Sequence, residues 1–274
     1  EISACLVGSE MCIRDRLKTV RKRRKRQMGK LISVWGTPGS GKTAFSVKLA
    51  SALCRDRNKR ENAVIVIFTD MIAPSLPVIF PNYRTQDIFS LGTVLSKPDI
   101  TAFDIASNMV TLRSSANLGF LGYRANENKF SYPEYTGEKA EVFLENVCTM
   151  ADYVIVDCMS MPQDSILTKT ALTHSHQGIR LSSPDLKCLS FTMSQLPIFL
   201  SNGYVKENQI QIMNVLNQDI SMPVSDVSSH LGNILCTLPY SQELARQVTE
   251  GTVMEPLRDR KFMQVMNMIA ERVR

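Results

Sequence analysis

Short apolar runs alternate along the chain with longer segments in which apolar residues recur every three or four positions. The short runs are rich in Val, Ile and Leu and predict buried strands of a parallel sheet. They are Leu31–Val34, Val64–Phe68, Leu118–Gly122, Tyr153–Val156, Gly178–Leu181, Gln209–Met213 and Ile234–Leu238. The longer segments predict helices at Lys42–Arg55, Thr101–Val110, Lys139–Thr149, Ser165–Thr173, Pro184–Leu200, Val224–Leu231, Ser241–Glu250 and Asp259–Val273. This order predicts an α/β fold with a three-layer, doubly wound, mostly parallel sheet.

The alternation also indicates where the domain begins. Residues 28–274 are expected to form one domain, because they contain no internal repeat and no low-complexity linker. Cys5–Arg16 looks like a translated sequencing adapter, whereas Met28 leads directly into the first predicted strand. We therefore expect residues 1–27 to be an artefactual or disordered leader. The alternative is that the basic run Lys18–Arg26 is a native arm for a membrane or nucleic acid.

The leader changes the interpretation of the charge. The chain has 32 Lys and Arg against 26 Asp and Glu, which gives a net charge of +6. Residues 1–27 hold nine of the basic and three of the acidic residues and account for the whole excess. The rest is formally neutral and gives no electrostatic argument for DNA. Outside the leader the cysteines are scattered without a C-x-x-C pair, which favours a reducing, cytoplasmic setting.

One motif predicts a phosphate site. Residues 36–43 match G-x-x-x-x-G-K-[ST] and lie between a predicted strand and a predicted helix. The glycines let backbone amides turn around phosphate oxygens at the positive end of the helix. Lys42 would serve the β- and γ-phosphates, and the Thr43 hydroxyl would bind Mg²⁺. The residues expected at the phosphates are Gly36, Thr37, Pro38, Gly39, Ser40, Gly41, Lys42, Thr43 and Ala44.

Two aspartates follow predicted strands. Asp157 ends the run Tyr153-Val-Ile-Val-Asp, and Asp70 follows the strand Val64–Phe68. Because the carboxyl ends of parallel strands meet at the ligand-binding edge of a sheet, both are expected near the phosphates. We assign Asp157, together with Thr43, to Mg²⁺. Either aspartate could instead be a helix N-cap or a turn residue.

From Met28 onward the order of these features resembles the ParA/MinD ATPases. The resemblance continues late in the chain with Ile-Met-Asn214 and with Leu-Pro239-Tyr240-Ser-Gln-Glu-Leu. It implies a SIMIBI-type P-loop NTPase that binds ATP and Mg²⁺, with Lys42 and Asp70 as catalytic residues. Asp70 would position the attacking water, Asn214 would contact adenine, and Pro239 and Tyr240 would border the base. Asn214 could also be a strand-end turn residue.

The same resemblance implies an ATP-dependent homodimer that recruits a protein partner. Members of the family commonly carry a second lysine early in the P-loop, which reaches the phosphates of the partner across the dimer. This chain has Thr37 there, with Pro38 in place of a glycine, and Phe68 replaces the first acid of the usual D-x-D pair. Without that lysine the transferred phosphoryl group would lose one stabilising contact. The chain therefore also resembles divergent TadZ-like proteins, which act mainly as localisation scaffolds.

Three functions follow in order of preference. The first is a slow, cytoplasmic ATPase switch that positions partition, division or pilus and secretion machinery. The amphipathic segment Asp259–Val273 is expected to pack on the sheet, and the alternative is a helix that contacts a membrane. The second is a scaffold that binds nucleotide without hydrolysing it. A small-molecule kinase ranks lowest, because residues 160–176 offer no arginine for a lid. ATP is favoured over GTP because Asn217-Gln-Asp219 lacks the spacing of a guanine-binding loop.

Overall fold

The computed structural model describes residues 28–55, 61–82, 89–112, 115–205, 207, 209–218 and 222–274. The leader, including Lys18–Arg26, and Asp219 lie outside these ranges, so the predictions about them remain predictions.

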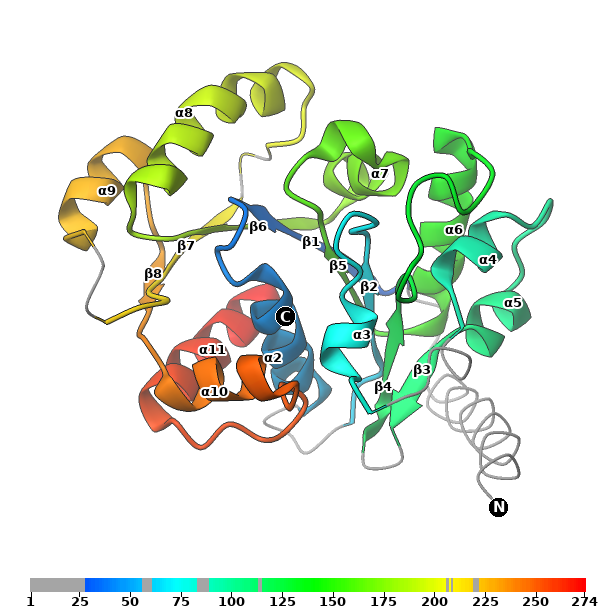
Figure 1. Ribbon diagram of the computed structural model, residues 1–274, viewed down its shortest axis with the longest axis horizontal. Coiled ribbons are helices and arrows are strands. Elements are labelled where there is room, and N and C mark those ends of the chain that lie inside the picture. Colours follow the sequence, from blue (N-terminus) through cyan, green and yellow to red (C-terminus); the bar gives the residue numbers. More distant parts are fainter. Residues whose placement is uncertain are drawn as a thin grey trace.

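Within the described residues, eight strands form one sheet in the order β3-β4-β2-β5-β1-β6-β7-β8 (Figure 1). The strands are β1 (Lys30–Gly36), β2 (Val64–Phe68), β3 (Val110–Leu112), β4 (Ser115–Leu121), β5 (Tyr153–Asp157), β6 (Gln177–Ser182), β7 (Ile210–Asn214) and β8 (Cys236–Leu238). All pairs are parallel except that of β3 with β4 at one edge. The predicted mostly parallel sheet is confirmed.

Helices cover both faces of this sheet (Figure 1). On one face lie α2 (Lys42–Cys54), α3 (Leu76–Ile79), α10 (Gln242–Glu250) and α11 (Arg260–Val273). On the other lie α4 (Leu91–Leu95), α5 (Ala102–Ser107), α6 (Gly137–Met150), α7 (Ile166–His174), α8 (Leu186–Ser201) and α9 (Val224–Leu231). The three-layer architecture is therefore also confirmed.

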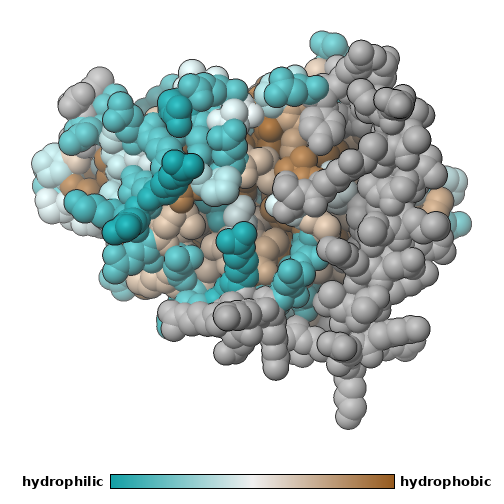
Figure 2. All heavy atoms as spheres, turned by 90° about the horizontal axis from the view of Figure 1, so that it is seen from below, coloured by the Kyte–Doolittle hydropathy of each residue, from teal (hydrophilic) through white to brown (hydrophobic). Residues whose placement is uncertain are grey.

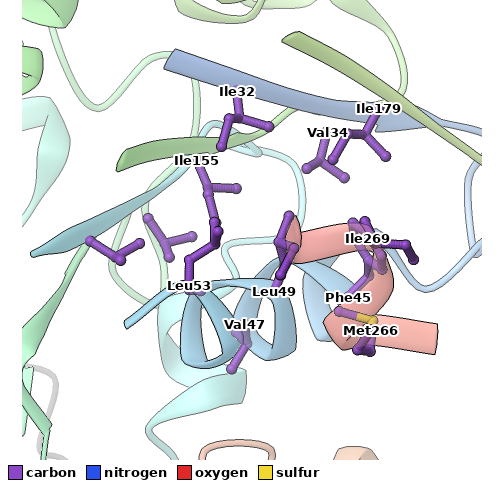
Figure 3. Close-up of a cluster of buried hydrophobic side chains, with 14 of the residues drawn as sticks. Ile32, Val34, Phe45, Val47, Leu49, Leu53, Ile155, Ile179, Met266 and Ile269 are labelled. Atoms are coloured by element: carbon purple, nitrogen blue, oxygen red, sulfur yellow. The ribbon is translucent and has the colours of Figure 1, made fainter. Parts of the chain in front are cut away.

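Alternation along β1 shows how the sequence builds two cores. Ile32 and Val34 point to the face covered by α2 and α11, whereas Leu31 and Trp35 point to the opposite face. Figure 3 shows the first of these cores, in which Ile32 and Val34 lie above Leu49. Because both faces of β1 are buried, the positions between Lys30 and Gly36 are apolar except for Ser33, as expected for a central parallel strand.

The last helix packs on the sheet. Its apolar stripe contains Phe262, Met266, Ile269 and Val273, all buried in the core that also contains α2. Each such side chain stabilises the fold by roughly 1.5–3 kcal/mol, so packing accounts for the amphipathic pattern. The outer surface on the side of α10 and α11 is mostly hydrophilic (Figure 2). Within the described residues, no helix has the length and apolar character needed to cross a membrane.

The predicted helix Thr101–Val110 is wrong at its carboxyl end. A capping box between Thr101 and Asp104 starts α5 as expected, but α5 ends at Ser107 and Val110 begins β3. Val110 pairs instead with Phe120 of β4. The helices α3 and α4 were not predicted, because each is too short to show a helical period in the sequence.

Candidate functional site

A cavity of about 640 Å³ opens where β1, β2, β5, β7 and β8 end. This volume is typical of a small-molecule site. Its charged lining residues are Lys42, Asp70 and Asp157, which lie at or just after the ends of β1, β2 and β5, and its polar lining includes Thr43, Ser75, Ser160, Asn214, Tyr240 and Ser241. Its apolar lining after β7 and on the last helices is Val215, Leu216, Leu244, Ala245, Val248 and Phe262. The cavity therefore combines a charged region with an apolar one.

The loop between β1 and α2 depends on its glycines. Gly41, the N-cap of α2, has φ 84°, a left-handed conformation that glycine adopts without strain. A Cβ atom at Gly36 would lie 1.9 Å from the Leu181 carbonyl oxygen of β6. Only glycine lets β1 approach β6 this closely. The first amides of α2 have no acceptor within the helix, and they lie beside the cavity, where an anion could accept from them.

Lys42 spans the mouth of this loop. Its Nζ donates to Ser160 Oγ at 2.6 Å and to the Thr37 carbonyl at 3.0 Å. Burial lowers the pKa of Lys42, although Asp157 and Asp70 oppose this shift. Nζ also donates to the Gly36 carbonyl at 3.5 Å, so all three of its acceptors are neutral and none is a carboxylate that would compete with a phosphate for the ammonium. Lys42 is therefore placed to compensate an anion in the cavity.

Thr43 and Asp157 meet beside Lys42. Thr43 Oγ1 donates to Asp157 Oδ2 at 2.7 Å, and Ser46 Oγ donates to Oδ1 at 3.4 Å. Burial raises the pKa of Asp157 to about 6, and the Thr43 hydrogen bond and Lys42 counter the shift. A hydroxyl and a carboxylate are hard oxygen donors that suit Mg²⁺, which commonly takes its other ligands from phosphate and water. Among the described residues, no group of three or more His, Cys, Asp and Glu could hold a metal by itself.

Asp70 lines the same cavity and also closes a turn. Its Oδ1 accepts from the amides of Ile72 at 2.8 Å and Ala73 at 2.9 Å. The geometry therefore fits both sequence interpretations, the turn residue and the acid near the phosphates. The role in positioning water remains a prediction.

Asn214 contacts the phosphate loop. Its Nδ2 donates to the Ser40 carbonyl at 2.9 Å, and the side chain is buried. Pro239 and Tyr240 line the cavity with it. The structure thus brings together the three residues that were predicted to surround the base. The amide nitrogen of Asn214 supports the phosphate loop, and the contact of this side chain with a base remains a prediction.

The phosphate-loop residues divide into two groups. Pro38, Gly39, Gly41, Lys42, Thr43 and Ala44 line the cavity. Gly36, Thr37 and Ser40 do not, and the side chains of Thr37 and Ser40 are buried. Ser40 Oγ donates to the Thr37 carbonyl at 2.8 Å and so stabilises the loop.

Thr37 faces the interior of the protein. It lines a second cavity of about 10 Å³ beneath α8 with Arg180 and Gln195. Within the described part of the chain, Thr37 Oγ1, Arg180 Nε and Gln195 Oε1 are buried without hydrogen-bond partners. The Thr37 side chain therefore does not reach the main cavity, and the predicted contact of its backbone with the phosphates remains a prediction. The loop turns the side chain toward β6 and α8.

Sequence reasoning missed Ser160, Leu216, Leu244 and Phe262. Ser160 follows Asp157 by three residues, and its only sequence signal was closeness to a strand-end acid. The apolar residues look like ordinary core positions in the sequence. They line the cavity only because β7, α10 and α11 come together at its rim.

No protein-family model matches this chain, and no curated protein matches it. Solved structures do match. The ParA family ATPase from Chlorobium tepidum TLS has 14% sequence identity and a TM-score of 0.72, over 89% of this chain and 99% of that one. MinD from Pyrococcus horikoshii OT3, complexed with Mg-ADP, has 18% identity and a TM-score of 0.67, over 90% and 96%.

A putative plasmid partition protein from Borrelia burgdorferi B31, bound to AMPPNP, has 17% identity and a TM-score of 0.66, over 88% and 97% of the two chains. At these identities the similarity establishes the fold. The chain has a ParA/MinD-like P-loop fold, as its sequence predicted.

Proposed function

We propose that this protein binds ATP with Mg²⁺ and acts as a ParA/MinD-like switch that positions a protein partner and hydrolyses ATP slowly. The observation that carries the proposal is the cluster of Lys42, Thr43 and Asp157 at the mouth of a phosphate loop. The apolar half of the cavity, with Pro239 and Tyr240, supplies room for a base.

Each residue at the site would have a separate role in binding the nucleotide. Amides after Gly39 would bind phosphate oxygens, and Lys42 would move from Ser160 to the β- and γ-phosphates. Thr43 and Asp157 would hold Mg²⁺, which neutralises charge on the phosphates when bound. The second carboxylate oxygen of Asp70 would orient a water molecule. The solved relatives with Mg-ADP and AMPPNP support this choice of ligands.

A second candidate is a nucleotide-dependent scaffold without turnover. The burial of Thr37 favours it, because no cation from this position would reach the phosphates of a partner. The two candidates share the binding site and differ only in the chemical step.

Binding and phosphate release should be measured together, by calorimetry with ATP and Mg²⁺ and by a phosphate assay at saturating ATP. We expect wild type to bind ATP, Lys42→Ala to bind it at least about tenfold more weakly, and Asp70→Ala to bind it within about twofold of wild type. A loss of turnover in both variants supports the switch. Tight binding with no phosphate release supports the scaffold, and no binding by wild type refutes both.

A further inference from the structure

Lys48 is a buried cation on the helix that follows the phosphate loop. Its residue is only 3% exposed. Nζ donates to Gln247 Oε1 at 2.6 Å, to the Val253 carbonyl at 2.7 Å and to the Glu255 carbonyl at 2.8 Å. An ammonium group has three N–H donors, so these bonds use all of them. All three acceptors are neutral oxygens, and they come from α10 and the loop after it.

These bonds hold α10 and its loop as one unit. Besides accepting from Lys48, Gln247 donates from Nε2 to the Pro256 carbonyl at 3.3 Å. The Gln247 carbonyl accepts from the Thr252 amide at 2.8 Å. Glu243, one turn earlier on α10, accepts from the amides of Arg258 and Asp259 through Oε2. The unit therefore has many internal bonds, and Lys48 joins it to α2.

The opposite side of α10 forms a wall of the main cavity. Leu244, Ala245 and Val248 line that cavity, whereas Gln247 between them is buried toward Lys48. The position of Gln247 therefore sets where this wall stands. At its N-terminal end, α2 also carries Lys42 and Thr43, which line the charged region. One rigid helix thus links the charged and apolar regions of the cavity.

Burying a charged group is unfavourable unless hydrogen bonds compensate the loss of its hydration. Burial lowers the pKa of Lys48 to about 8, against the opposing influence of Glu243 and Glu255. A purely apolar contact between α2 and α10 would avoid this cost. The fixed directions of three hydrogen bonds offer instead a defined separation between the two helices.

We infer that Lys48 is a positioning residue that sets the α10 wall at the separation from the phosphate loop that a nucleoside requires. This inference rests on the proposed nucleotide site and concerns its base-binding half. Lys48 itself does not line the cavity. It acts through Gln247 and α10, so it should affect the binding of the base and sugar and not the binding of the phosphates.

The test compares two ligands that share phosphates but differ in the base. Dissociation constants of ATP and of inorganic tripolyphosphate, each with Mg²⁺, should be measured by calorimetry on the full chain. In Lys48→Met, which keeps the length of the side chain and removes its donors, we expect ATP to bind about tenfold more weakly. Tripolyphosphate should bind within about twofold of wild type.

Lys30→Met is the matched control. Lys30 Nζ also donates to a carbonyl of the C-terminal region, that of Val273 at 2.6 Å, but this bond joins β1 to the end of α11 and not to α10. Both ligands should bind this variant as they bind wild type. If Lys48→Met does not fold, Gln247→Leu removes one acceptor only and should weaken ATP about threefold, with tripolyphosphate unchanged.

Equal losses for both ligands, or an unchanged affinity for ATP, in whichever variant folds, would overturn the inference. Wild type that binds tripolyphosphate as tightly as ATP would also overturn it, while leaving the phosphate site in place. Wild type that binds neither ligand would refute the proposed function itself. The two failures are therefore distinguishable.

Discussion

Asp157 shows how one buried carboxyl group is balanced between its neighbours. Thr43 and Ser46 donate to it and Lys42 lies near it, and all three favour the charged form. Burial favours the neutral form and prevails, since the pKa rises from 3.8 to about 6. A bound divalent cation would reverse this balance, because positive charge stabilises a carboxylate.

This balance predicts how stability depends on pH in the protein without ligand. The folded protein holds the Asp157 proton more tightly than the unfolded chain does, and this tighter binding stabilises the fold. The stabilisation is complete below about pH 4 and is lost as pH rises through about 6. Asp157→Asn removes it. The free energy of unfolding of wild type relative to this variant should fall by an amount on the order of 3 kcal/mol over that window.

Urea denaturation at several pH values between 4 and 7 measures this difference. Asp99→Asn, at an exposed position, is the control and should follow wild type throughout. If Asp157→Asn showed the same pH profile as wild type, burial would not dominate at Asp157.

Single residues differ in how far their sequence context determines them. The positions of Lys42, Thr43 and Asp157 follow from the phosphate-loop spacing and from strand ends, because neighbours along the chain fix both. Ser160 and Lys48 could not be assigned in this way. Ser160 contacts a residue that is 118 positions away in the sequence, and the contacts of Lys48 are 199 and 205 positions away. Only the folded sheet brings those segments together.

At the scale of elements, the phosphate loop is packed against α8 as well as against the main cavity. The Thr37 side chain fills part of the small cavity that Arg180 and Gln195 also line. Arg180 is buried with its Nη2 bonded to Gln211 Oε1 and to the Leu231 carbonyl. The positive charge of Arg180 therefore lies beneath α8, next to Thr37, which takes the place of the second lysine of the ParA/MinD pattern.

This packing predicts opposite effects for two substitutions. Thr37→Val keeps the volume and removes a buried hydroxyl without a partner among the described residues, so stability should stay within about 0.5 kcal/mol or rise. Thr37→Lys, which introduces the second lysine of the ParA/MinD pattern, would bury an ammonium beside Arg180 and should destabilise the fold by about 3 kcal/mol or more.

Thermal and urea unfolding of both variants test this prediction. Thr170→Val in α7 is a matched control, because its buried hydroxyl donates to the Ile166 carbonyl in its own helix. A stable Thr37→Lys variant with wild-type unfolding would show that the side chain at this position turns outward.

The longer elements were predictable because each buries a face with its own period. Val64–Phe68 matches β2 at both ends, and Val224–Leu231 matches α9. The three-residue strand β3 was not predictable. It exists because it pairs with β4 at the edge of the sheet. The pairing with β4, and not the local sequence pattern, therefore determines that these residues form a strand.

At the scale of the whole molecule, the mouth of the main cavity is more apolar than a solvated surface requires. Ile72 is 76% exposed, Leu216 42% and Met161 36%, and all three line the cavity. They come from the loops after β2, β7 and β5. Exposed apolar side chains gathered around a site are a common mark of an interface.

This rim predicts that nucleotide changes the oligomeric state. Filling the charged cavity with ATP and Mg²⁺ would place ligand between apolar rims that a second copy could cover, in keeping with the homodimer that the sequence resemblance implies. In size-exclusion chromatography of the full chain and of residues 28–274, we expect a shift from monomer to dimer with ATP and Mg²⁺ and none with ADP. Ile72→Ser should weaken the shift while ATP still binds. An elution volume that is the same with and without nucleotide would favour the scaffold, because a switch needs two states that bind ATP with different affinity.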